Sequence, residues 1–134
     1  MPRIINEEVI HCITESIHDV VAIYHFGSSA IDQEHLDSDV DLAILTTKKA
    51  DPTTLYKLRE KCSQILKKNV DIAYLNGATP VFVMQVLESG HVIYCQNQKT
   101  LAYFEIRMMS EYCDLNLERR EIIKDIIKRG SVYG

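Results

Sequence analysis

The chain has 134 residues, of which 46% are hydrophobic and 25% are charged, and its formal net charge at pH 7 is −4. This length and composition are typical of an ordinary globular protein, and we expect one domain over residues 1–134. The acidic balance, interrupted only by short basic clusters, disfavours a protein that binds nucleic acid directly through its phosphates.

The sequence carries no signal for membrane insertion or export. It lacks a long apolar run, and its start, MPRIINEEVI, lacks the basic segment followed by an apolar one that a secretory signal has. The four cysteines are scattered and form no Cys-x-x-Cys pair, which disfavours a zinc site and fits reduced thiols. We therefore expect a cytoplasmic protein without a membrane partner.

Helical and extended patterns alternate along the chain. In chain order we expect a helix over 7–18, a strand over 19–26, a short helix over 28–33, a strand over 39–46, a helix over 51–68, a strand over 69–75, a helix over 80–89, a strand over 91–95 and a helix over 99–129. Two of these helices open with a cap residue followed by proline, Asp51-Pro52 and Thr79-Pro80. The alternation indicates an α/β fold, close to the border with α+β, in which the strand-to-helix loops are the natural place for chemistry.

The last predicted helix is apolar on two faces. One stripe holds Leu101, Phe104, Met108, Tyr112 and Leu115, and the other holds Ala102, Ile106, Met109, Cys113 and Leu117. A helix of this kind is normally covered on both sides, so we expect one face on the sheet and the other on a partner. Residues 114–116 are a candidate break in this helix.

Three polar features interrupt the apolar strands. Gly27-Ser28 follows the first strand; a glycine lets the backbone approach a ligand, while the serine and the N–H groups of a following helix can hold phosphate oxygens. Asp39 and Asp41 lie two positions apart on the second strand and therefore share one face of it. Asp71 lies on the third strand, which we expect in the same sheet.

Three ionised carboxylates at one edge of a sheet repel one another unless a cation lies between them. Mg²⁺ fits this role, because it takes oxygen ligands, keeps several waters and is commonly completed by the phosphates of a substrate. Each feature alone is more often structural, as a turn, a solvated strand edge or a surface aspartate. Together they predict a magnesium site that binds a nucleotide.

The motif also resembles a known signature. GSSAIDQEHLDSDVD has the pattern of the polymerase-β-like nucleotidyltransferase superfamily, which is Gly-Ser, ten intervening residues and Asp-x-Asp. NVDIAYL resembles the strand that carries the third carboxylate in this superfamily. Almost the whole chain is similar to the minimal nucleotidyltransferases (MNT), including the MntA-type antitoxins, of HEPN/MNT toxin–antitoxin pairs. One departure is GSSAID, where many relatives read GSRARG.

The resemblance implies a polymerase-β-like core, with a small mixed sheet flanked by helices and a long C-terminal helix. It implies that Asp39, Asp41 and Asp71 ligate two Mg²⁺ ions, and that Asp71 helps to deprotonate the attacking hydroxyl. Gly27 and Ser28 would hold the β- and γ-phosphates of ATP. The implied reaction is in-line attack on the α-phosphorus with loss of pyrophosphate. The implied function is an antitoxin that transfers AMP to a tyrosine of a cognate HEPN ribonuclease toxin within a hetero-oligomer.

Two other functions remain open at this point. A small-molecule nucleotidyltransferase, acting for example on an aminoglycoside, suits the acidic balance, but so short a chain needs a homodimer to enclose such an acceptor. An antitoxin that masks its partner sterically needs no chemistry, and the retained carboxylates disfavour it. His25 is best explained as a buried strand histidine. Arg119 has the spacing of the apolar stripe and either faces a partner or a phosphate or lays its stem along apolar surface, and we assign it no role.

Overall fold

The computed structural model describes residues 7–27, 39–48 and 51–128. In chain order its elements are α1 (Glu7–Ser16), β1 (Val20–Phe26), β2 (Val40–Thr46), α3 (Pro52–Leu66), β3 (Val70–Tyr74), α4 (Pro80–Ser89), β4 (His91–Cys95) and α5 (Gln98–Lys128). The predicted elements are confirmed to within two residues at each end, except that the short helix expected over 28–33 lies outside the described residues.

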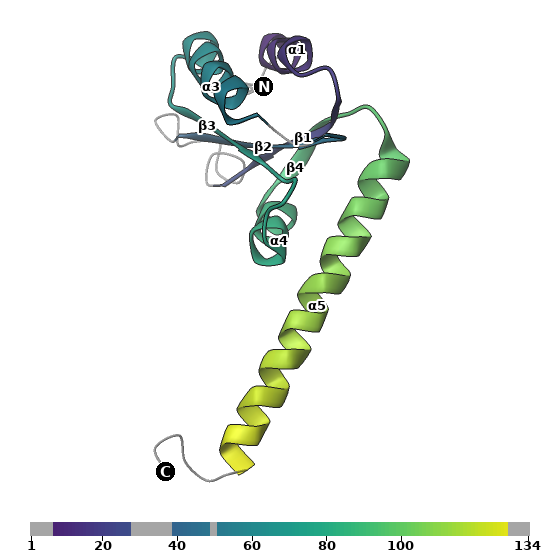
Figure 1. Ribbon diagram of the computed structural model, residues 1–134. Helices are drawn as coiled ribbons and strands as arrows, with labels where there is room; N and C mark the ends of the chain where they lie inside the picture. The colour runs from purple at the N-terminus through teal and green to yellow at the C-terminus, as the bar shows by residue number, and fades with distance from the viewer. Residues whose placement is uncertain (1–6, 28–38, 49–50, 129–134) are drawn as a thin grey trace.

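The strands form one mixed sheet in the order β3-β2-β1-β4 (Figure 1). β1 runs antiparallel to both β2 and β4, whereas β2 and β3 are parallel. A parallel pair needs a crossover, and α3 provides it between β2 and β3. The mixed sheet flanked by helices confirms the predicted fold, and it leaves β3 as one edge strand.

Helices cover both faces of the sheet. Figure 1 shows α1 and α3 on one face and α4 with the start of α5 on the other. Successive side chains of β2 divide accordingly, because strand residues alternate between faces. Leu42 and Ile44 join the core under α1 and α3, while Ala43 and Leu45 join the core under α4 and α5. By the same alternation Asp41 belongs to the α4/α5 face.

The two predicted capping sites are confirmed. The side chain of Asp51 accepts a hydrogen bond from the backbone N–H of Thr53 at 3.0 Å, and Pro52 opens α3. The hydroxyl of Thr79 accepts from the backbone N–H of Phe82 at 3.2 Å at the start of α4. These contacts satisfy backbone N–H groups that have no partner inside the helix, and they therefore fix where each helix begins.

Helix α5 has 31 residues and is continuous, so the break expected over 114–116 is wrong. Asp and Asn cost only about 0.5 kcal/mol each in a helix interior, and the leucines, glutamates and arginines around them are strong helix formers. At 1.5 Å per residue the helix is about 46 Å long. Only its first turns pack on the sheet, through Leu101, Phe104 and Met108, as predicted for this stripe.

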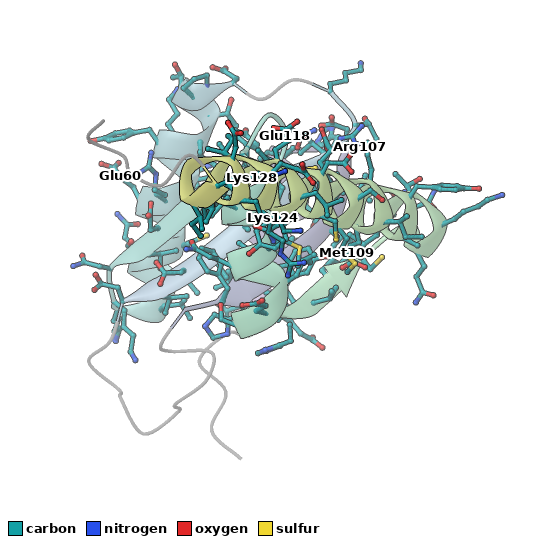
Figure 2. The ribbon with its side chains drawn as sticks, turned by 90° about the horizontal axis from the view of Figure 1, so that it is seen from below. Glu60, Arg107, Met109, Glu118, Lys124 and Lys128 are labelled. Carbon is teal, nitrogen blue, oxygen red and sulfur yellow. The ribbon has the colours of Figure 1, made fainter. Side chains whose placement is uncertain are left out.

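The rest of α5 extends away from the sheet (Figure 1). Leu115 is half-buried, and the second stripe, which includes Ile106 and Met109, is exposed. Figure 2 looks at the molecule from below and shows Glu118, Lys124 and Lys128 arranged around this outer half of the helix. None of the helices in the described ranges combines the length and the apolarity that crossing a membrane requires.

Candidate active site

The strand register brings three of the predicted site residues side by side. Asp41 on β2 lies opposite Phe26, the last residue of β1, on one side, and opposite Asp71 of β3 on the other. Gly27 follows Phe26 directly, and Asp39 precedes β2 by one residue. Gly27, Asp41 and Asp71 therefore lie in a row across three adjacent strands. Ser28, which we expect to hold phosphate, lies outside the described residues.

Gly27 is required by the geometry of this row. Its φ angle is +81°, a conformation that residues with a Cβ rarely adopt. A Cβ at this position would lie 2.4 Å from Oδ2 of Asp41. The backbone N–H of Gly27 donates a long hydrogen bond, 3.5 Å, to Oγ of Ser89 at the end of α4. The glycine therefore lets the β1 backbone lie directly against a site carboxylate.

Asp41 is the buried member of the carboxylate group. Its side chain is partly buried, whereas Asp39 and Asp71 are exposed. Desolvation raises the pKa of Asp41, and the negative charges of Asp71 and Asp39 raise it further. An ionised Asp41 is therefore unfavourable in the protein alone, and a cation beside it would relieve both causes.

Arg59 of α3 is a site neighbour that our sequence analysis missed. Its Nη1 lies 3.3 Å from Oδ1 of Asp71. Its Nε is buried and has no hydrogen-bond partner in the described part of the chain. The sequence offers no specific signal for this contact, because Arg59 lies one helical turn after the buried Leu55, a position that many charged residues take beside an apolar stripe.

The carboxylates have the chemistry of a Mg²⁺ site without forming a closed cage. Among the described residues, no three His, Cys, Asp or Glu side chains are gathered closely enough to enclose a metal. One oxygen of Asp71 faces Arg59 instead. This arrangement fits Mg²⁺, which is usually held by one or two carboxylates together with waters and substrate phosphates rather than by protein ligands alone.

The two other residues that we considered near the site, His25 and Arg119, lie outside the row of site residues. His25 of β1 is only 5% exposed, and its ring contacts that of His91 at 5.5 Å between centroids. Burial and the neighbouring His91 lower the pKa of His25 to about 4, so its imidazole is neutral at pH 7. Arg119 is exposed on the outer half of α5. Neither residue contributes to the row formed by Gly27, Asp41 and Asp71.

Comparison with known proteins agrees with the motif and with the fold. The family model described as polymerase beta, nucleotidyltransferase matches residues 7–99. The protein adenylyltransferase MntA of Shewanella oneidensis is 28% identical over 127 residues, which are 95% of this chain and 91% of that protein.

Solved structures give the same result. A chain of a toxin–antitoxin complex with AMP-PNP is 30% identical and superposes with a TM-score of 0.78, over 92% of this chain and 99% of that one. A chain of the tri-AMPylated Shewanella oneidensis HEPN toxin in complex with MNT antitoxin is 27% identical, with a TM-score of 0.73 over 90% and 94% of the two chains. The resemblance and the fold that we inferred from the motif are thus confirmed.

Proposed function

The chain belongs to the polymerase beta nucleotidyltransferase family, and on this premise we propose that it is a Mg²⁺-dependent protein adenylyltransferase acting as an antitoxin. It transfers AMP from ATP to a tyrosine hydroxyl of a cognate HEPN ribonuclease, with which it forms a hetero-oligomer in the cytoplasm. The observation that carries the proposal is the row of Gly27, Asp41 and Asp71 across β1, β2 and β3. The similarity to MntA, a protein adenylyltransferase, supports the choice of a protein acceptor.

Each member of the row has one role in this proposal. The backbone at Gly27, together with Ser28, holds the β- and γ-phosphates. Asp39, Asp41 and Asp71 would hold Mg²⁺, which when bound neutralises the triphosphate and polarises the bond that breaks. The tyrosine oxygen attacks the α-phosphorus, the bond to the bridging oxygen of pyrophosphate breaks, and Asp71 accepts the tyrosine proton. Positioning and electrostatics supply most of the rate in such a site.

The outer half of α5 is the surface that we assign to holding the partner. Its apolar side chains are between 55% and 72% exposed, and they are Leu117, Ile122, Ile123 and Ile127. They stand among charged residues, and exposed apolar side chains gathered on one element mark a surface that binds a partner. The solved relatives that combine an MNT antitoxin with a HEPN toxin support a toxin as the partner that covers it.

The test uses the product of the adjacent gene as the candidate acceptor. We would incubate the two proteins with ATP and Mg²⁺ and measure the intact mass of the acceptor. The expected result is a gain of one or more AMP masses, which disappears when ATP or Mg²⁺ is omitted. The Asp39→Asn/Asp41→Asn double variant, which keeps the size of both side chains, should bind the partner and add no AMP.

The outcomes separate the remaining alternatives. An unchanged mass in a stable complex would mean that the protein masks its partner sterically. An unchanged mass without a complex, together with AMP transfer to a cationic small molecule, would identify a small-molecule nucleotidyltransferase. A double variant that still protects cells from the toxin would refute the enzymatic version of the antitoxin.

A further inference from the structure

The order of the strands gives the proposed reaction a direction. In-line displacement requires the attacking oxygen and the leaving oxygen to lie on opposite sides of the phosphorus. On the proposed function, the leaving pyrophosphate lies near Gly27 at the end of β1, and the base Asp71 lies on β3. β2, with Asp41, lies between these two strands. The acceptor hydroxyl must therefore approach from the β3 side.

This side of the sheet is open within the described part of the chain, because β3 is the edge strand. The neighbouring element there is α3, which is joined to β3 by polar contacts. The backbone N–H of Val70, at the start of β3, donates to Oγ of Ser63 at 3.1 Å. Arg59 lies one turn earlier on α3 and contacts Asp71. The outer surface of α3 is thus continuous with the base of the proposed reaction.

A groove of about 360 Å³ lies on this outer surface. We call it the α3 groove, and its lining residues are Tyr56, Arg59, Glu60, Ser63 and Gln64. Its positions recur at intervals of three and four residues, which places them on one stripe of the helix. Arg59 belongs both to this groove and to the contact with Asp71, so a ligand in the groove lies beside the candidate site.

The groove has the chemistry of a site for a polypeptide segment. Within the residues that the structure describes, the Nε–H of Arg59 is a buried donor without a hydrogen-bond partner, and such a group costs roughly 1–3 kcal/mol until it finds an acceptor. A backbone carbonyl or a carboxylate of a bound segment would supply one. The ring of Tyr56, which is 60% exposed, offers an aromatic surface, and Gln64 offers an amide. The carboxylate of Glu60 adds a negative charge to the groove, so the groove does not select anions alone.

We propose that the α3 groove is the acceptor-docking site of the enzyme. It binds the segment of the HEPN partner that carries the accepting tyrosine, while the outer half of α5 holds the rest of the partner. The inference rests on the proposed function and adds the path by which the tyrosine reaches Asp71. Arg59 acts in it as a positioning residue, because it joins the bound segment to the carboxylate that takes the proton.

The kinetic test compares two neighbouring positions on α3. Tyr56→Ala removes a ring from the groove, and Lys57→Ala is the matched control, because Lys57 is exposed on the same turn and does not line the groove. In the preformed complex with saturating ATP and Mg²⁺, we expect Tyr56→Ala to slow the single-turnover transfer of AMP at least tenfold. Tyr56→Phe, which keeps the ring, should restore the rate to within about twofold.

Two binding measurements separate docking from damage to the fold. The affinity of each variant for AMP-PNP and for the partner should stay within about twofold of the wild type, because the groove touches neither Gly27 nor α5. A loss of AMP-PNP affinity in Tyr56→Ala equal to its loss of rate would overturn the inference. Equal transfer rates in Tyr56→Ala and Lys57→Ala would overturn it as well.

A physical contact provides the second readout. A photo-crosslinking amino acid placed at position 56 should join the partner at the peptide that contains the adenylylated tyrosine, whereas the same probe at position 57 should not. A crosslink from position 56 to a distant part of the partner would refute the inference and leave the proposed function intact. If the wild-type protein transfers no AMP to the partner at all, both the proposed function and this inference fail.

Discussion

Replacement of Gly27 by alanine tests whether the close approach of β1 to Asp41 matters for the reaction. The added Cβ would lie 2.4 Å from Oδ2 and 3.3 Å from Cγ of Asp41. Carbon and oxygen atoms that are not bonded rarely approach within 3.0 Å, so the carboxylate must move by about 1 Å or the strand end must shift. The substitution therefore displaces the carboxylate at the centre of the row without removing its charge.

The expected losses differ for stability and for activity. An alanine at a φ of +81° is strained by about 1–2 kcal/mol. For a protein of this length, that strain lowers the melting temperature by roughly 4–7 °C. A displacement of about 1 Å in a site that works by positioning can cost about 100-fold in rate. The loss of activity should therefore be much larger than a few degrees of melting temperature would suggest.

Gly77 provides a matched control for this substitution. Its φ angle is +77°, nearly that of Gly27, but a Cβ there meets nothing within 4 Å. Gly77→Ala and Gly27→Ala should lose similar amounts of melting temperature by thermal denaturation, while only Gly27→Ala loses AMP transfer in the intact-mass assay at 25 °C. Equal transfer rates in the two variants would refute the argument that Gly27 is needed to accommodate Asp41.

Three further substitutions test the electrostatics and the capping of the fold. Because the pKa of Asp41 is raised, its ionised form destabilises the folded state at pH 7, and this penalty disappears as the pH falls through that pKa. Asp41→Asn should therefore have a higher melting temperature than the wild type at pH 7 without Mg²⁺, and the difference should shrink in acid. A lower melting temperature for this variant at pH 7 would show that ionised Asp41 stabilises the folded state. His25 has its pKa lowered to about 4, so the unfolded chain takes up a proton below pH 6.5 that the folded protein does not, and up to about 3 kcal/mol of stability is lost between pH 6.5 and pH 4. Denaturant unfolding across this range should show a smaller loss of stability for His25→Gln than for the wild type. Asp51→Ala removes the cap of α3 and should cost about 1 kcal/mol, or roughly 4 °C of melting temperature, with AMP transfer unchanged; an unaltered melting curve would show that the cap contributes nothing.

The sequence was sufficient to predict most of the fold, because its local signals and its tertiary structure agree. The cap-proline pairs fixed the starts of α3 and α4, and α4 and β4 lie over the predicted residues. The prediction of a helix break at 114–116 was wrong because a local signal and the surrounding sequence disagree. Asp114 and Asn116 weaken a helix only slightly, and the helix formers on both sides outweigh them. A composition that disfavours a helix locally is therefore not evidence for a break within a long one.

The sequence predicted that Asp39, Asp41 and Asp71 lie at one edge of the same sheet, but not which residues face one another across the strands. The spacing of Asp39 and Asp41 gives a shared face on one strand, yet the pairing of Asp41 with Asp71 depends on the register of a parallel pair that only the fold sets. The contact between Gly27 and Asp41 likewise joins strands that lie opposite each other. Arg59 was missed because its helical position looks like that of any charged residue at the border of an apolar stripe.

The arrangement of α5 suggests how partner binding and chemistry are joined in so small an enzyme. The hydroxyl of Tyr24 on β1 donates to a carboxylate oxygen of Glu105, which fixes the inner half of α5 on the same face of the sheet that Asp41 belongs to. Burial and Glu105 raise the pKa of Tyr24, so this donor keeps its proton at neutral pH. On the proposed function, a toxin held on the outer half of α5 would lie on the side of the carboxylates, and its tyrosine segment would have to reach the β3 edge. Helix α5 and the turn at Gly27 are both attached to β1, because Tyr24 lies three residues before Gly27. On the proposed function and with the acceptor docked at α3, binding and transfer would use different surfaces of the same chain: α5 would hold the partner, and α3 with β3 would receive the acceptor.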